Sequence, residues 1–369
     1  MRETLRTSRL GRRAFIILTV LIAALALLAL ACSGGEDVEP DGSGTPAATA
    51  TGANGSEPTP PPGGDNCVPG DGPPSMGVGP DLPGKITYVR LVFGCNPDVY
   101  IMDANGDNAR ALADDPLLDD ESDLSHDGTR VVFFSGRTGQ AILYMVNVDG
   151  SDLHVLSESR GGDVSPRWSP DDSQIAFSRA GSIAVMDSDG TGVRIVMTAQ
   201  NAASAEECRA GAFVGGWSPD GERIVYYSAI VSGEGNRFWI CAVDVDDGDI
   251  EVLVSEPDDG LHAEPHWSPD GTKIVFRDDR ETIEACSTTG GACNYEVFVL
   301  DLETGEETNI TNNPALDIEP VWSPDGEWIL FASNRDDPFF DLYIVRPDGS
   351  DVQRILIDPD SKDSYPSWQ

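Results

Sequence analysis

The stretch Trp217-Ser-Pro-Asp-Gly221 decides the fold of this chain because it is repeated along the sequence. Two further copies are identical, one ends in Asp instead of Gly, one is degenerate (Leu-Ser-His-Asp-Gly), and one is only begun by the last residues. These copies start, in that order, at Trp267, Trp322, Trp168, Leu124 and Trp368. Neighbouring copies are 44 to 55 residues apart, which is in the range expected of β-propeller blades.

Each copy is followed by the pattern of three more strands. After Gly221, the run Arg223-Ile-Val-Tyr-Tyr227 is rich in β-branched and aromatic residues, and Phe238 to Asp244 has the same character. The turn Asp247-Gly248 suits a hairpin because its residues tolerate positive φ, and Leu253-Val254 ends a last strand. We therefore expect each repeat to be a four-stranded antiparallel meander. Its Ser-Pro-Asp-Gly segment should form a turn, and its Trp should pack between neighbouring blades.

The number of repeats predicts a closed ring. The run Lys85-Ile-Thr-Tyr-Val89 opens a unit without a Trp copy in front of it, whereas Tyr365-Pro-Ser-Trp368 has no strands after it. The C-terminal segment is therefore expected to supply the innermost strand of blade one, which removes the open sheet edges. The predicted fold is all-β: a six-bladed β-propeller of four-stranded antiparallel blades over residues 85–369, closed by the C-terminal strand in blade one.

The repeated string with its following β-run resembles the WD40-like propeller repeat of the TolB type over residues 85–369. The resemblance implies a propeller protein of the bacterial cell envelope. The sequence ahead of the repeats does not have the pattern of the N-terminal α/β domain that TolB proteins carry. The resemblance is thus limited to the propeller, a fold that hosts many functions, and the Tol-Pal role is not carried over.

The first residues have the pattern of an export signal. A basic start, with five arginines, precedes an uncharged and largely apolar run from Ala14 to Ala31. The run ends in Leu28-Ala29-Leu30-Ala31-Cys32, which is similar to the lipobox of bacterial lipoproteins. Residues 1–31 are therefore predicted to be a lipoprotein-type signal peptide, with Cys32 as the site of lipid attachment. The alternative is an uncleaved signal anchor, because the run is close to the minimum length for a spanning helix.

Residues 32–84 are predicted to be a disordered linker. The segment is dominated by Gly, Pro, Ser, Thr, Ala and acids, with almost no large apolar residue, so it cannot bury enough surface to offset the entropy of ordering. Its expected role is to hold the propeller away from the membrane. The predicted location is therefore extracytoplasmic, with a lipid anchor in a bacterial membrane.

The net charge of −39 argues against nucleic acid as a partner, because nucleic-acid binding needs a basic surface. A monomer without a cofactor is expected. Of the seven cysteines, six remain after Cys32, in a compartment that permits disulfides. Cys286 and Cys293 flank a short polar loop and predict a local bridge. Cys67–Cys95 and Cys208–Cys241 are the suggested pairs for the rest, among fifteen connectivities.

A candidate binding face comes from the residues just before each innermost strand. Acidic residues recur five and three positions before the Trp position: Asp119, Glu121, Asp163, Glu264, Asp317, Glu319 and Asp363. The meander places these segments on one face, around the mouth of the central channel, where they would create a negative potential. The alternative is that these carboxylates cap local backbone amides.

No enzyme activity is predicted. The sequence has no Gly-x-Ser-x-Gly elbow and no His-Glu-x-x-His motif, and no catalytic, cofactor-binding or metal-binding residue is assigned. The expected function is a membrane-tethered interaction module of the cell envelope that recruits a protein or peptide on its acidic, loop-rich face. The alternative is a propeller with a small-molecule, sugar or metal site in the channel, with or without enzymatic activity.

Overall fold

The computed structural model describes residues 75–76, 82–92, 95–113, 117–157, 162–200, 207–232, 235–255, 261–280, 294–336, 339–357 and 361–369. The chain divides into two compact units, Met1–Asn66 and Cys67–Gln369, and every described residue belongs to the second. The predicted signal peptide and Cys32 lie outside the described residues, as does most of the predicted linker. No helix in the described part has the length and apolar character needed to cross a lipid bilayer.

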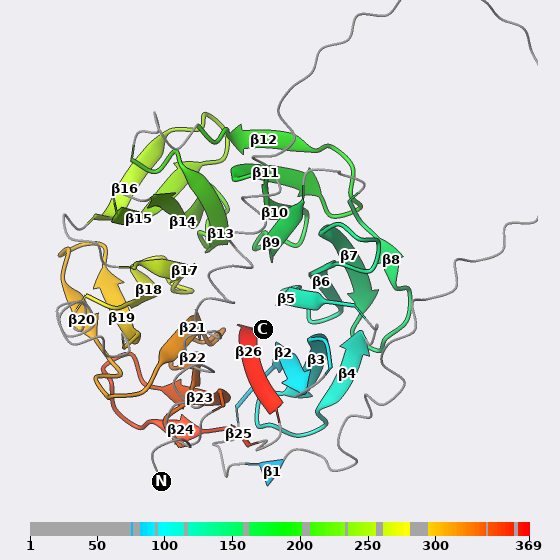
Figure 1. Cartoon of the computed structure of the whole chain (residues 1–369), viewed down its shortest axis with the longest axis vertical. Helices are drawn as coiled ribbons and strands as arrows, with labels where there is room; N and C mark the ends of the chain where they lie inside the picture. The colour runs from blue at the N-terminus through cyan, green and yellow to red at the C-terminus, as the bar shows by residue number, and fades with distance from the viewer. Residues whose placement is uncertain are drawn as a thin grey trace, which may run out of the picture. The chain divides into compact units, whose positions relative to one another are not determined.

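Six four-stranded antiparallel sheets surround a common centre (Figure 1). From the innermost strand outward, blade one consists of β26 (Ser361–Trp368), β2 (Lys85–Val92), β3 (Asp98–Asp103) and β4 (Arg110–Ala113). Blade two consists of β5 (Asp119–Leu124), β6 (Arg130–Ser135), β7 (Ile142–Asn147) and β8 (His154–Val155). Blade three consists of β9 (Asp163–Trp168), β10 (Gln174–Arg179), β11 (Ser182–Asp187) and β12 (Arg194–Met197).

The second half of the ring repeats this order. Blade four consists of β13 (Gly211–Trp217), β14 (Arg223–Ser232), β15 (Gly235–Asp244) and β16 (Ile250–Ser255). Blade five consists of β17 (Ala263–Trp267), β18 (Lys273–Asp278), β19 (Glu296–Asp301) and β20 (Glu307–Asn309). Blade six consists of β21 (Asp317–Trp322), β22 (Ile329–Ser333), β23 (Asp341–Val345) and β24 (Gln353–Arg354). The predicted six-bladed propeller is confirmed.

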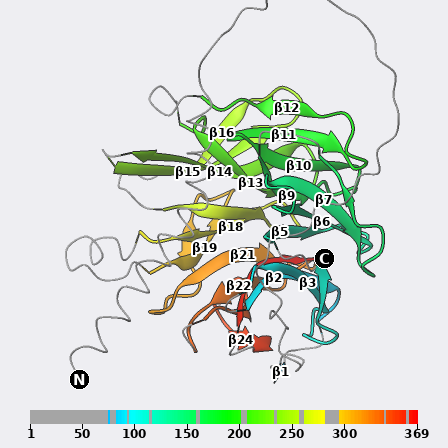
Figure 2. The ribbon, with the colours of Figure 1, turned by 45° about the vertical axis from the view of Figure 1, so that its right-hand side comes forward.

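A short sheet outside the blades joins β1 (Ser75–Met76) to β25 (Leu356–Ile357), with Met76 opposite Leu356. The turned view in Figure 2 shows β1 beside blade six, close to β24. The end of the predicted linker is therefore attached to the outer part of the propeller and does not lie in its centre.

The Ser-Pro-Asp-Gly turns are built from the hydrogen bonds that their residue types allow. In blade four the Ser218 hydroxyl donates to Asp220 (2.5 Å) and accepts from the Arg223 amide (2.9 Å). Gly221 takes a positive φ of 75°, a conformation that favours glycine. The same serine–aspartate pair recurs in blades two, three, five and six. The repeated string therefore specifies a turn, as predicted.

The tryptophans of the repeat fill the space between neighbouring blades. Trp217 of blade four packs with Ala176 and Val185 of blade three, and Trp168 of blade three packs with Phe134 of blade two. All five tryptophans of the copies are at most 8% exposed. Burying a side chain of this size stabilises the fold by a few kcal/mol, so the copies hold adjacent blades together.

The ring is closed by the C-terminal strand. β26 pairs with β2, with Trp368 opposite Ile86, and the Lys85 amide donates to the Gln369 carbonyl at 2.6 Å. The Trp368 indole N–H also donates to the Pro83 carbonyl (3.1 Å). Blade one is therefore assembled from both ends of residues 85–369, as the sequence predicted.

One predicted disulfide lies among the described residues. Cys208 and Cys241 are bonded, with Cα atoms 6.0 Å apart and a separation of 33 positions in sequence. Cys95 is also disulfide-bonded, but Cys67, its predicted partner, lies outside the described residues. Cys286 and Cys293 lie outside them as well, so those two pairings stay predictions.

Candidate functional site

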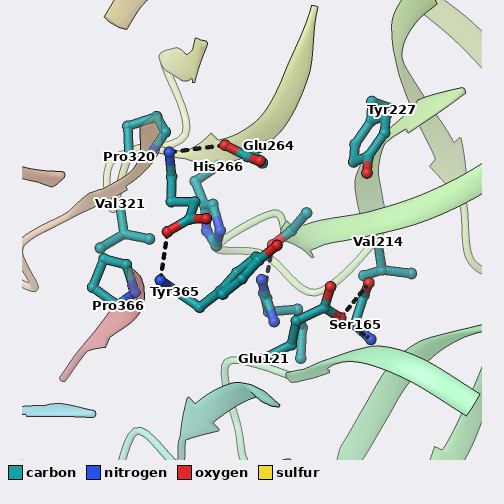
Figure 3. Close-up of a pocket in the computed structure, with 13 residues that line it drawn as sticks. Glu121, Ser165, Val214, Tyr227, Glu264, His266, Pro320, Val321, Tyr365 and Pro366 are labelled. Carbon is teal, nitrogen blue, oxygen red and sulfur yellow. Dashed lines mark hydrogen bonds between the residues drawn. The ribbon is translucent and has the colours of Figure 1, made fainter. Parts of the chain in front are cut away.

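The innermost strands carry a β-bulge where they approach the channel mouth. In five blades the residue three positions before the Trp position has a positive φ, between 47° and 56°: Glu121, Ser165, Glu264, Glu319 and Tyr365. The pairing register shifts at the same place, for example between Asp120 and Asp123. Bulges redirect side chains, and here the redirected side chains converge on one pocket (Figure 3). The sequence located this position but did not predict the bulge.

The three glutamates of this set bind backbone amides of the next blade. Glu121 accepts from the Ser165 amide (2.6 Å) and hydroxyl (2.8 Å). Glu264 accepts from the Glu319 amide at 2.8 Å, and Glu319 accepts from the Tyr365 amide at 2.6 Å. In each case one carboxylate oxygen, Oε2, is the acceptor, so the other oxygen is left for a different contact. These bonds fix each carboxylate at the mouth and join blade two to three, five to six and six to one.

Basic groups stand beside these carboxylates. Arg277 forms an ion pair with the second oxygen of Glu264 at 3.1 Å. The Arg167 side chain donates to two backbone carbonyls, Gly215 (2.9 Å) and Pro166 (2.8 Å). The pocket that the three glutamates line together with Arg167 has a volume of about 50 Å³, which is room for a few water molecules. A macromolecular ligand would therefore bind over the mouth and would not enter it.

Burial at the mouth raises the pKa of three carboxyl groups, Asp120, Glu121 and Glu319. Burial raises the pKa of Asp120 to about 8, with a further contribution from the neighbouring Glu121 carboxylate. Burial also raises the pKa of Glu319 to about 7, opposed by Lys362 and supported by Glu264. Asp120 and Glu319 therefore exchange protons near neutral pH. The charge that the mouth presents thus depends on pH in the physiological range.

The other four predicted acidic residues are not available to a partner in this arrangement. Their carboxylates are fully buried and paired with an arginine of the same blade. The pairs, with their shortest distances, are Asp119–Arg137 (2.7 Å), Asp163–Arg179 (2.7 Å), Asp317–Arg335 (3.0 Å) and Asp363–Arg90 (2.8 Å). The predicted seven-residue face therefore separates into an inner set of three glutamates at the channel and a buried set of four aspartates. Their roles differ because the bulge redirects the glutamate side chain, which a regular strand would place on the same face as the aspartate two residues before it.

Blade five has a histidine in the place of the buried aspartate. His262 is fully buried, and its Nδ1 lies 2.6 Å from an Asp278 carboxylate oxygen. His266 instead lines the channel, where burial and the nearby Arg167 hold its pKa well below the usual value. Among the described residues no group of three His, Cys, Asp or Glu side chains is arranged to hold a metal ion.

The sequence analysis missed a second ring of channel residues. The residue directly before each Trp position also faces the channel: Asp123, Arg167, Gly216, His266, Val321 and Ser367. The signal for this ring was present, because residues two apart on a strand share a face. Applying that period from Ser165 and Glu264 would have identified Arg167 and His266.

Comparisons with known proteins agree with this architecture. The family model described as the Tricorn protease N-terminal β-propeller domain matches residues 143–356. A TolB homolog from Chlorobium luteolum is 29% identical over 60% of this chain and 46% of its own length. The Tol-Pal system protein TolB of Francisella tularensis is 25% identical over 77% of this chain and 63% of its own. The chain thus spans less than two thirds of either relative.

A solved structure gives the same fold. TolB from Acinetobacter baumannii superposes with a TM-score of 0.61, at 19% sequence identity, over 79% of this chain and 68% of that protein. At this level of identity the similarity concerns the fold alone.

Proposed function

Because this chain belongs to the Tricorn protease N-terminal β-propeller family and is a TolB-type propeller, we propose that it is a non-catalytic interaction module of the cell envelope. It recruits a protein or peptide at the channel mouth and is tethered to the membrane through a lipid on Cys32. The Francisella relative is named as part of a Tol-Pal system. We propose a comparable kind of role, protein recruitment in the envelope, and not that particular partnership.

One observation carries the proposal: Glu121, Glu264 and Glu319 are held in place before any partner arrives. Each accepts a backbone hydrogen bond from the next blade, so little side-chain entropy is lost on binding. Glu121 and Glu319 each retain an oxygen toward the pocket. Fixed acceptors in an acidic mouth favour a partner that presents basic or N–H groups.

The proposed role of the mouth is binding because Glu121 and Glu319 each use one carboxylate oxygen for a backbone amide, while both oxygens of Glu264 are engaged, by the Glu319 amide and by Arg277. The pocket at the glutamate mouth, with a volume of about 50 Å³, is too small for most organic substrates. A partner that covers the mouth from outside fits this geometry better than a substrate enclosed within it.

The experiment is capture from envelope extract with three forms of the full chain. The first is unchanged and the second carries Glu121→Gln, Glu264→Gln and Glu319→Gln. The third is a control with the same charge loss at exposed positions away from the mouth: Glu222→Gln, Glu303→Gln and Glu306→Gln. A partner held by the first and third forms and lost by the second supports the proposal. Equal capture by all three forms excludes the mouth as the binding site.

The captured partner is then titrated against the same forms. We expect the mouth variant to bind at least ~10-fold more weakly, which corresponds to about 1.4 kcal/mol. We also expect affinity to fall with added salt, because the contacts are electrostatic. The control variant should stay within about twofold of the unchanged chain.

A further inference from the structure

One backbone amide at the channel mouth lacks the side-chain acceptor that its counterparts have. Each blade has one amide three positions before the Trp position, and in three blades a glutamate of the preceding blade accepts from it. The Val214 amide donates instead to Ser178 Oγ (3.0 Å), and the Glu121 amide donates to Asp120 Oδ1 (2.8 Å). The remaining amide belongs to Glu264, and no described side chain accepts from it.

The acceptor is missing because blade four has a valine where blades two, five and six have a glutamate. Val214 stands at that position and lines the pocket with a side chain that cannot accept a hydrogen bond. Glu264 lies within the register shift between Ala263 and His266, so no residue is paired opposite it in its sheet. We call this place, between Val214 of blade four and Glu264 of blade five, the valine gap.

Two further donors line the same pocket. Arg167 uses Nε and Nη1 for backbone carbonyls, while its Nη2 has no hydrogen bond or ion pair with a described residue. The Tyr227 hydroxyl likewise has no hydrogen bond within the described ranges, and Figure 3 shows it directed toward the pocket. Burial raises the pKa of Tyr227, so the hydroxyl stays protonated and can donate. The valine gap thus offers three donors and no acceptor of its own.

The chain itself shows which group satisfies such donors. Where it fills the equivalent place, the acceptor is each time a carboxylate oxygen, 2.6 to 2.8 Å from the amide nitrogen. The Glu264 carboxylate, which does so for blade six, also pairs with Arg277 at 3.1 Å. An amide together with an arginine is therefore how this mouth holds a carboxylate, and the valine gap repeats that combination with Arg167. An apolar side chain in the gap would leave the donors without an acceptor, which costs free energy.

We propose that the valine gap binds a carboxylate side chain of the partner protein, in the place of the missing blade-four glutamate. This inference rests on the proposed function, because the same partner covers the channel mouth. It adds that the partner presents a glutamate or aspartate at this point, while its N–H groups meet Glu121 and Glu319. The pocket volume of about 50 Å³ admits the end of one such side chain. Hydrogen bonds to an ionised acceptor are also the stronger ones.

The charges at the mouth accommodate one more carboxylate. Arg167 has no ion pair with a described residue, whereas the charge of Glu264 is already compensated by Arg277. Burial raises the pKa values of Asp120 and Glu319 to about 8 and about 7. Both groups are therefore partly protonated near neutral pH, which reduces the repulsion that an incoming anion meets. A cationic side chain in the gap would instead stand beside the Arg167 guanidinium.

The test is a titration of the full chain with three capped tripeptides that differ in the central residue: Ala-Glu-Ala, Ala-Gln-Ala and Ala-Lys-Ala. The NMR chemical shift of the Glu264 backbone amide reports whether the gap is occupied. We expect the glutamate peptide to bind at least ~10-fold more tightly than the glutamine peptide, which corresponds to about 1.4 kcal/mol. The lysine peptide should bind more weakly still. Equal binding of the three, a preference for lysine, or an unshifted Glu264 amide would overturn the proposal.

Val214→Glu supplies the missing carboxylate from the chain itself. Because Val214 lines the pocket, the longer side chain should fill the gap and weaken binding of the glutamate peptide at least ~10-fold. Val214→Ala leaves the gap open and should stay within about twofold. Tyr227→Phe guards against a folding defect, because it removes only a hydroxyl that bonds to no described residue. It should weaken binding roughly threefold to tenfold, as expected for one hydrogen bond. Unchanged binding in either Val214→Glu or Tyr227→Phe would overturn the proposal.

Capture from envelope extract separates this inference from the proposed function. Both are supported if the partner is lost by the mouth variant with three glutamines and also by Val214→Glu. If the glutamine variant loses the partner but Val214→Glu retains it, the mouth binds without the valine gap. In that case this inference fails and the proposed function stands. A partner retained by the glutamine variant excludes the mouth, and both fail.

Discussion

The Asp172 carboxylate of blade three accepts hydrogen bonds from two consecutive amides of blade two, His126 at 2.8 Å and Asp127 at 2.9 Å. Asp172 stands where the other turns have glycine, and it keeps the positive φ of that position, 57°. His126 belongs to the degenerate copy Leu-Ser-His-Asp-Gly, which lacks both Trp and Pro. The two turns that depart from the repeat therefore contact each other, and the Asp172 carboxylate of blade three stabilises the degenerate turn of blade two.

Asp172→Ala should destabilise the domain by about 1–2 kcal/mol. The variant loses charge-assisted bonds to two amides and keeps a left-handed conformation that costs a non-glycine residue about 1 kcal/mol. Asp172→Gly should cost less than Asp172→Ala, because it relieves that conformation. The free energy of unfolding, measured in denaturant, gives the order. Equal loss in both variants would show that the strain is not significant.

Asp163→Ala should destabilise the domain by about 3 kcal/mol. It leaves the Arg179 guanidinium without the fully buried carboxylate that holds it through bonds of 2.7 and 2.9 Å, and breaking one side of a buried pair is costly. Glu251→Ala, which breaks an exposed pair with Arg223, is the matched control and should cost less than about 1 kcal/mol. Similar melting temperatures for the two variants would contradict a structural role of the buried pair.

The stability of the domain should decrease between pH 5 and pH 8 through Asp120 and Glu319. Their folded-state pKa values are raised, to about 8 and about 7, so the folded chain binds more protons than the unfolded chain in this window. Stability therefore falls as pH rises. Asp120→Asn and Glu319→Gln should flatten the pH dependence of the melting temperature. A slope unchanged by both substitutions would exclude these groups as its source.

Gly84→Ala should weaken the closure of the ring. A Cβ atom there would lie 2.2 Å from the Gln369 carbonyl oxygen, at a φ of 92°. Gly139→Ala is the control, because its φ is 81° but nothing lies within 4 Å of the added atom. We expect Gly84→Ala to cost at least ~1 kcal/mol more than the control, which carries only the conformational strain. Faster amide hydrogen exchange in β26 would place the destabilisation at the ring closure. Equal losses of unfolding free energy in the two variants would contradict a role of Gly84 in that closure.

The fold was predictable because the repeat combines turn chemistry with strand periodicity. Trp217-Ser-Pro-Asp-Gly221 fixes where one strand ends and the next begins, and the unmatched segments at residues 85 and 365 fix the closure. The site was predictable only in part. The positions of Glu121, Glu264 and Glu319 were identified, but their environment depends on a bulge and on amides of the next blade.

The buried aspartates show why residue type alone was insufficient. Asp163 and Glu121 have the same charge and both precede an innermost Trp position. Asp163 meets Arg179, sixteen residues along the chain, whereas Glu121 meets an amide of a different blade. A sequence does not state which of these neighbours a carboxylate will reach, because that depends on how adjacent blades are placed.

The closure of blade one also determines the order in which the domain is completed during synthesis. β2 leaves the ribosome first, but β26 and Asp363, the partner of Arg90 across 273 positions, leave last. During that interval the inner edge of β2 is unpaired, and such an edge readily pairs with other chains. The pairing of β26 with β2 therefore protects the inner edge of blade one only after residues 361–368 have been made.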